Sequence, residues 1–130
     1  MRYILFIIML ALGMASCSPL LRGRMHYSSL GVEDFARYIT KPDVVLVDVR
    51  TPEEFAAGHL PNVDRNLDVR SATFFKDYQS LPKDKTIALY CKGGGRSKQV
   101  AGVLAGNGYK VIELAVGYDG WVKAGGATEK

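Results

Sequence analysis

Three short, largely apolar stretches recur along the chain, at residues 44–47, 86–90 and 111–114. Each has the length and the nearly continuous apolar character of a strand that is buried on both faces of a sheet. Residues 66–69 are a weaker candidate for a strand, and residues 25–27 are a candidate for a short edge strand. The pattern therefore predicts several short strands rather than one long amphipathic element.

Apolar residues at helical spacing fill the intervals between these strands. The stripe formed by Val32, Phe35, Ala36 and Ile39 predicts a helix that ends before Pro42. Further helices are expected at 51–58, at 74–81, from Ser97 to a Gly-Asn-Gly stop at 106–108, and within 117–124. The Thr-Pro-Glu-Glu segment at 51–54 has the pattern of a capping box with proline in the first helical position. Alternating strands and helices predict an α/β fold with a mainly parallel sheet.

Composition narrows the class of protein. The chain has 130 residues, of which 48% are hydrophobic and 23% charged, so it has the size and content of one globular domain. A net charge of +4 is spread along the sequence, which gives no support to nucleic-acid binding. Two cysteines and two histidines exclude a disulfide-rich scaffold and a zinc finger, and we expect neither a metal nor an organic cofactor.

The amino-terminal segment differs from the rest of the chain. Residues 1–16 begin with a basic residue, continue through an apolar run and end in small residues, as a secretory signal peptide does. The run is shorter than the ~20 residues that span a bilayer, so a permanent transmembrane helix is the weaker interpretation. The exit sequence 12–17, Leu-Gly-Met-Ala-Ser-Cys, resembles a bacterial lipobox, the alternative being an ordinary signal with a chance cysteine.

We therefore expect a lipid on Cys17, a tether over 17–27, a folded domain over 28–124 and a frayed tail over 125–130. Such a protein would be anchored to a membrane of the bacterial cell envelope and face the periplasm or the exterior. With Cys17 modified, Cys91 is the one remaining thiol, so it must be either buried or used.

Cys91 is the strongest candidate for chemistry. It lies at the predicted carboxyl end of a strand, where ligands bind in open α/β sheets, and three consecutive glycines (93–95) and a predicted helix follow it. Glycines let several backbone N–H groups point inward, and the helix start adds more N–H groups and a positive dipole end. With Lys92 and Arg96, these features favour a thiolate and hence a nucleophilic sulfur.

Three chemistries use a loop of this type. A nucleotide-binding P-loop is excluded, because Tyr90 stands where its first glycine belongs. Cysteine phosphatases space cysteine and arginine by five residues, whereas only four residues separate Cys91 from Arg96. A smaller loop suits a sulfur atom bound to the cysteine better than a tetrahedral phosphate. The spacing therefore favours persulfide chemistry over phosphatase or arsenate reductase chemistry.

Several blocks in order resemble a single-domain rhodanese, a sulfurtransferase family. They are Val-Leu-Val-Asp-Val-Arg at 45–50, Glu-Glu-Phe at 53–55, Gly-His-Leu-Pro at 58–61, Cys-Lys-Gly-Gly-Gly-Arg-Ser at 91–97, and Gly-Tyr-Asp-Gly-Trp at 117–121. The resemblance implies a parallel sheet of about five strands with helices on both faces. It also implies transfer of sulfane sulfur, through a persulfide on Cys91, from a small anionic donor such as thiosulfate to cyanide, a thiol or a protein acceptor. A non-enzymatic sulfur carrier or sensor of the same fold is the alternative.

Residue roles follow from the same resemblance. Lys92, Gly93, Gly94, Gly95, Arg96 and Ser97 would bind the sulfur donor and the persulfide. Asp48, Arg50, Glu54 and His59 would support the neighbouring loops, with Arg50 paired to Glu54, although a catalytic role for these residues is the alternative. One departure is Asn-Val-Asp-Arg at 62–65, where the family has a glycine-alanine turn, and it puts the structure of that turn in doubt.

Overall fold

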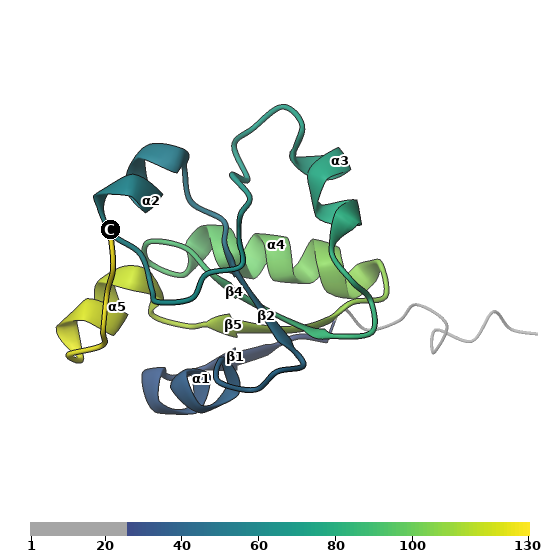
Figure 1. Cartoon of the computed structure of the whole chain (residues 1–130). Helices are drawn as coiled ribbons and strands as arrows, with labels where there is room; N and C mark the ends of the chain where they lie inside the picture. The colour runs from purple at the N-terminus through teal and green to yellow at the C-terminus, as the bar shows by residue number, and fades with distance from the viewer. Residues whose placement is uncertain (1–25) are drawn as a thin grey trace, which may run out of the picture.

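The computed structural model describes residues 26–130 and contains one parallel sheet of five strands (Figure 1). The strands are β1 (Ser28–Leu30), β2 (Val44–Asp48), β3 (Arg65–Asn66), β4 (Thr86–Tyr90) and β5 (Lys110–Leu114). Their order across the sheet is β1-β5-β4-β2-β3, and every neighbouring pair is parallel. The expected α/β fold with a small parallel sheet is confirmed. Cys17 and the predicted signal segment 1–16 lie outside the described residues.

Helices cover both faces of the sheet, as Figure 1 shows. The helices are α1 (Val32–Tyr38), α2 (Pro52–Ala57), α3 (Phe74–Asp77), α4 (Gly95–Gly106) and α5 (Gly117–Lys123). Successive strand residues point to opposite faces, so Leu89 packs in one core cluster with α3 and α4. Ala88 and Tyr90 pack in the other cluster, with Phe35 of α1 and Trp121 of α5. Both faces of the central strands are therefore buried, which explains their continuous apolar sequence.

The start of α2 matches its sequence pattern closely. The Glu54 backbone N–H donates to the Thr51 hydroxyl at 3.2 Å, and the Thr51 N–H donates to the Glu54 carboxylate at 3.3 Å. Pro52 occupies the first helical position, where no backbone donor is needed. The capping box is confirmed.

Most element boundaries lie within one residue of the sequence-based expectations, and four elements differ by more. The edge strand is β1, Ser28–Leu30, because its register is set by pairing with β5, and residues 26 and 27 of the expected strand 25–27 precede it. Met25 lies outside the described residues. Strand β3 comprises Arg65–Asn66 rather than 66–69, and the helix expected at 74–81 is α3 followed by a 3₁₀ turn, Tyr78–Ser80. Helix α4 begins at Gly95, two residues before the expected start at Ser97.

The turn at 62–65 is well held despite its unusual sequence. Asn62 has φ 61°, a left-handed conformation that asparagine tolerates better than most residues, and so it can replace a glycine. The Asp64 carboxylate accepts a hydrogen bond from the Leu46 backbone N–H at 2.8 Å, which ties the turn to β2. Although the sequence departs from the family pattern, Asn62 and Asp64 therefore maintain a tight turn.

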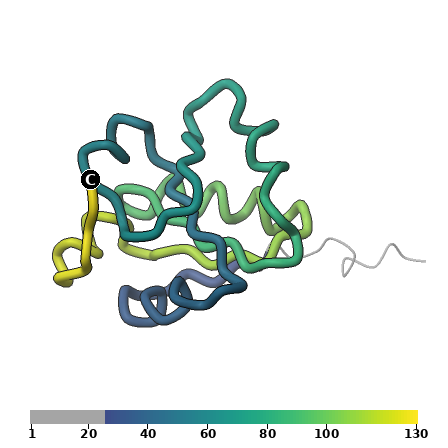
Figure 2. The backbone as a smooth tube through the Cα atoms, in the orientation of Figure 1, coloured from purple at the N-terminus to yellow at the C-terminus, as the bar shows by residue number. Residues whose placement is uncertain are grey.

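The carboxyl-terminal tail is ordered, so the expectation that residues 125–130 fray is wrong. The Trp121 indole N–H donates to the Ala127 carbonyl at 2.8 Å. His59 and Glu129 exchange two backbone hydrogen bonds, at 2.9 and 2.8 Å. Figure 2 shows the yellow carboxyl-terminal segment running up to the chain that leaves α2. These partners lie far away in sequence, which is why the local sequence of the tail did not reveal them. Within residues 26–130, no helix is long and apolar enough to cross a membrane.

Candidate active site

Cys91 directly follows β4 and is 1% exposed. The Gly94 backbone N–H donates to its Sγ at 3.1 Å, so the loop already presents one donor to the sulfur. The start of α5 holds the loop from the other side, because Tyr118 N–H donates to the Cys91 carbonyl at 2.8 Å and Asp119 N–H to the Lys92 carbonyl at 3.0 Å. The carboxyl ends of β4 and β5 thus build the site together.

Two glycines in this region cannot be replaced without strain. Gly94 has φ 100°, and a Cβ there would lie 2.2 Å from the Ala115 carbonyl oxygen. Gly117 has φ 64°, and a Cβ there would lie 2.4 Å from the Lys92 carbonyl oxygen. Gly93 and Gly95 are different, since a Cβ at either would meet no atom within 4 Å. The close packing of the two loops therefore depends on Gly94 and Gly117.

Ser97 connects Cys91 to an acidic residue that the sequence analysis did not single out. The Ser97 hydroxyl lies 3.4 Å from Cys91 Sγ and donates to Glu113 Oε2 at 2.7 Å. Glu113 is in β5 and fully buried, and its other oxygen accepts from the Ser29 hydroxyl and lies 3.2 Å from Lys98 Nζ. The available signal was a single carboxylate in the otherwise apolar stretch 111–114, but the sequence does not show which helix packs over it.

Arg96 points to Glu54 in α2. Its two terminal nitrogens donate to the two carboxylate oxygens of Glu54 at 2.7 and 2.9 Å. The hydrogen bonds from Arg96 lower the pKa of Glu54 to about 2, and the same bonds raise the pKa of Arg96. This bidentate pair fixes α2 against the beginning of α4.

Lys92 has a more exposed partner. Its ammonium lies 2.7 Å from the Asp119 carboxylate, and both side chains are more than half exposed. An exposed ion pair of this kind contributes little free energy, so Lys92 can leave Asp119 for another anion. A neighbouring pocket of about 200 Å³ is lined by Arg50, Glu54, Lys92, Tyr118 and Asp119, among others.

Arg50 pairs with Asp48, so the expected pairing of Arg50 with Glu54 is wrong. Both residues are buried, and Arg50 donates to the Asp48 carboxylate through Nε at 3.0 Å and through a terminal nitrogen at 2.7 Å. Burial alone would lower the pKa of Arg50, but hydrogen bonds to Asp48 and its charge outweigh this and raise it. Arg50 also donates to the Gly58 carbonyl at 2.7 Å and stacks on the Tyr118 ring at 4.3 Å. Glu54 is unavailable because it pairs with Arg96.

His59 contacts both helix α2 and the carboxyl-terminal tail. Its ring stacks on Phe55 with centroids 4.0 Å apart, and its Nδ1 lies 2.8 Å from the Leu60 carbonyl oxygen. The backbone of His59 also forms the bridge to Glu129. These contacts are those of a residue that anchors a turn. Across the described residues 26–130, no group of three or more His, Cys, Asp or Glu side chains could hold a metal ion.

The Arg96–Glu54 pair makes stability depend on pH. Because the pKa of Glu54 falls from 4.5 to about 2 on folding, the pair stabilises the protein above pH 4.5 and loses this contribution as the pH falls toward 2. Glu54→Gln retains a side chain suited to the capping box and should cost about 1–2 kcal/mol at pH 7. Urea unfolding at several pH values should show this difference shrinking below pH 4.5.

The exposed neighbour Glu53 provides the control for this prediction. Glu53→Gln should change the free energy of unfolding by less than ~0.5 kcal/mol at every pH, as surface substitutions usually do. A difference between the wild type and Glu54→Gln that stays constant from pH 7 to pH 3 would contradict the assigned ion pair.

Comparison with known proteins agrees with the geometry. A sulfurtransferase from Allochromatium vinosum is 36% identical over 84 residues, which are 64% of this chain and 76% of that protein. A tRNA uridine(34) hydroxylase from Wigglesworthia glossinidia brevipalpis is 31% identical over 111 residues, but the match spans only 34% of that longer protein. The crystal structure of a rhodanese-related protein from Thermoplasma volcanium superposes with a TM-score of 0.71. It covers 79% of this chain and 98% of its own at 24% identity, which supports the fold alone.

The match to a family model is broader than these pairwise similarities. The model is described as Rhodanese-like domain and matches residues 31–124, from the turn before α1 to the residue after α5. The matched range includes all five helices and the whole Cys91 loop. The chain therefore belongs to the rhodanese-like domain family.

Proposed function

We propose that the protein is a sulfurtransferase that carries sulfane sulfur as a persulfide on Cys91. The observation that supports this most directly is the position of Cys91 Sγ, buried at the base of a glycine loop whose Gly94 N–H points at the sulfur from 3.1 Å. A sulfur anion in such a loop is stabilised by fixed N–H dipoles, as an oxyanion is in other enzymes. Family membership and a relative named sulfurtransferase support the same function.

The reaction has two displacement steps. The Cys91 thiolate attacks the outer sulfur of a donor such as thiosulfate, a sulfur–sulfur bond to Cys91 forms, and sulfite leaves with the electron pair of the broken bond. The terminal sulfur of the persulfide then carries the negative charge toward the loop amides. Cyanide or a thiolate attacks that sulfur in the second step, and the Cys91 thiolate leaves. A protein acceptor would enter at the same point.

The two loop cations have unequal parts in donor binding. Arg96 is held by two hydrogen bonds to Glu54 and is only 18% exposed, so its main role is to fix the loop. Lys92 is 60% exposed, and its partner among residues 26–130 is the exposed Asp119, so it can turn toward an incoming anion at little cost. Lys92 is therefore the better candidate to attract the sulfonate end of thiosulfate.

The persulfide itself is the first test. Treatment of the full chain with thiosulfate should add one sulfur atom to the peptide that contains Cys91, and cyanide should remove it. Peptide mass spectrometry under non-reducing conditions measures this directly and separates Cys91 from Cys17. Cys91→Ser is the control and should gain no sulfur.

Other outcomes favour the alternative functions. A persulfide that forms but transfers its outer sulfur to cyanide no faster than a small-molecule persulfide does would favour a sulfur carrier. Hydrolysis of phosphate esters without any persulfide would favour a phosphatase. The absence of added sulfur on a Cys91 thiol that still reacts with iodoacetamide would exclude the proposed transfer from thiosulfate.

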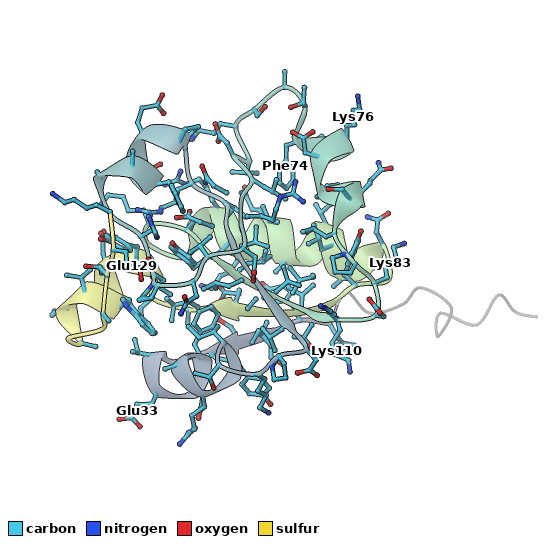
Figure 3. All side chains as sticks on the ribbon, in the orientation of Figure 1. Glu33, Phe74, Lys76, Lys83, Lys110 and Glu129 are labelled. Carbon is cyan, nitrogen blue, oxygen red and sulfur yellow. The ribbon has the colours of Figure 1, made fainter. Side chains whose placement is uncertain are left out.

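Lys92→Ala tests donor binding. It should raise the KM for thiosulfate about two- to fivefold, as loss of one partly exposed charge contact predicts, and leave kcat largely unchanged. Lys110→Ala is the matched control, because Lys110 is an exposed lysine at the amino end of β5, away from the carboxyl ends that build the site (Figure 3). Equal KM values for the two variants would show that Lys92 does not contact the donor.

We also propose that the protein acts while anchored to a membrane of the cell envelope by a lipid on Cys17. The lipobox-like sequence at 12–17 supports this proposal. The wild type expressed in a bacterial host should fractionate with membranes and yield an acylated amino-terminal peptide, whereas Cys17→Ala should carry no acyl chain and lose stable membrane association. An unmodified Cys17 in the wild-type protein would contradict the proposal.

A further inference from the structure

Basic side chains around the Cys91 loop are already matched by carboxylates. The four pairs are Arg50 with Asp48, Lys92 with Asp119, Arg96 with Glu54, and Lys98 with Glu113. A thiolate on Cys91 would add a fifth negative charge at a sulfur that is 1% exposed. Since an unbalanced buried charge is costly, formation of the thiolate is easier when a nearby carboxylate takes up the proton.

Glu113 is the carboxylate that is connected to Cys91. One hydroxyl separates them: Ser97 Oγ lies 3.4 Å from Cys91 Sγ and 2.7 Å from Glu113 Oε2. The Ser97 side chain is fully buried, so its hydroxyl contacts both Cys91 and Glu113 away from solvent. The hydroxyl has a single proton and two acceptors, Glu113 Oε2 at 2.7 Å and the more distant Gly94 carbonyl at 3.2 Å. Donating the proton to Glu113, the nearer of the two, leaves an oxygen lone pair facing the sulfur.

The groups around Glu113 are donors, so they hydrogen-bond its carboxylate form, which is the form that can accept a proton. From β1 the Ser29 hydroxyl donates to one carboxylate oxygen, and from α4 the Lys98 ammonium faces that same oxygen at 3.2 Å while Ser97 faces the other. Lys98 is further fixed by the Gly94 and Ala115 carbonyls, at 3.3 and 3.0 Å. With one proton shared between them, Cys91 and Glu113 carry a single negative charge, and the Lys98 ammonium lies at the Glu113 end of the pair.

We propose that Glu113 is a positioning residue that receives the Cys91 thiol proton through Ser97. In this step the Cys91 S–H bond breaks as its proton forms a new O–H bond on Ser97, and the original Ser97 proton moves to Glu113 Oε2. The products are a thiolate and a protonated Glu113, with no change in total charge. Ser97 then donates to the sulfur, which also accepts from the Gly94 N–H.

The same hydrogen bonds would stabilise the persulfide. While the negative charge is on the persulfide, the proton stays on Glu113 and Ser97 continues to donate to Sγ. When an acceptor removes the outer sulfur, the thiolate returns and the proton can move back to it. This catalytic role rests on the proposed sulfur transfer, whereas the proton transfer itself is measurable without any sulfur donor.

The test is the pH dependence of Cys91 alkylation by iodoacetamide in the full chain, followed on the Cys91 peptide by mass spectrometry. Two coupled groups that share a proton titrate in two steps. The wild-type rate should therefore rise in two steps separated by more than ~1 pH unit, with a plateau between them, since the thiolate fraction is constant while one proton is shared. Glu113→Gln should show one step, because it removes one of the two titrating groups. Ser97→Ala retains both groups and both steps, but its rate on the plateau should be lower, because the thiolate loses the hydroxyl that donates to it.

Ser29→Ala is the matched control, because it removes a hydrogen bond from the same carboxylate without touching the path to Cys91. It should keep both steps and the wild-type plateau rate, because Ser29 does not contact the sulfur. If circular dichroism shows that Glu113→Gln does not fold, the plateau rate of Ser97→Ala carries the test. A single step in the wild type, two steps in Glu113→Gln, or an unchanged plateau rate in Ser97→Ala overturns the proposal. Two steps in a wild type that forms no persulfide would support the proton relay and reject the sulfur transfer.

Discussion

The site depends on the close approach of the loop after β4 to the turn after β5. Gly94 and Gly117 make this approach possible, because each has a positive φ and each would place a Cβ within 2.4 Å of a carbonyl oxygen of the other loop. The contact lets the first residues of α5 donate to the Cys91 and Lys92 carbonyls. The sulfur is consequently held at the base of the loop, facing the Gly94 N–H rather than solvent.

Around this loop, charge is organised in pairs. The buried pair Arg50–Asp48 fixes the end of β2 and reaches the Gly58 carbonyl, while Arg96 joins α4 to Glu54 of α2. These pairs make the rim of the site rigid, but they also leave little free positive charge for a buried thiolate. Backbone dipoles stabilise the sulfur anion, and the proposed movement of a proton to Glu113 would add to their effect.

Much of the site could be predicted from the sequence, because its main parts are contiguous. Cys91, the glycine loop and the helix after it follow one another, so local geometry already places backbone N–H groups around the sulfur. Glu113 could not be found in this way, since it is in another strand and touches Ser97 only through packing of α4 over β5. The partner of Arg50 was also missed: both Asp48 and Glu54 are close in sequence, and only the position of Arg96 decides between them.

The sequence by itself determined the parallel α/β fold and the capped start of α2, because these depend on patterns of neighbouring residues. It also determined the family, through ordered blocks that span residues 45–121. Tertiary structure alone decided the order of the strands, the ordered tail held by Trp121 and His59, and the buried path from Cys91 to Glu113. These features join residues that are distant in the chain, and their free energy comes from contacts that exist only after the sheet and its helices have packed.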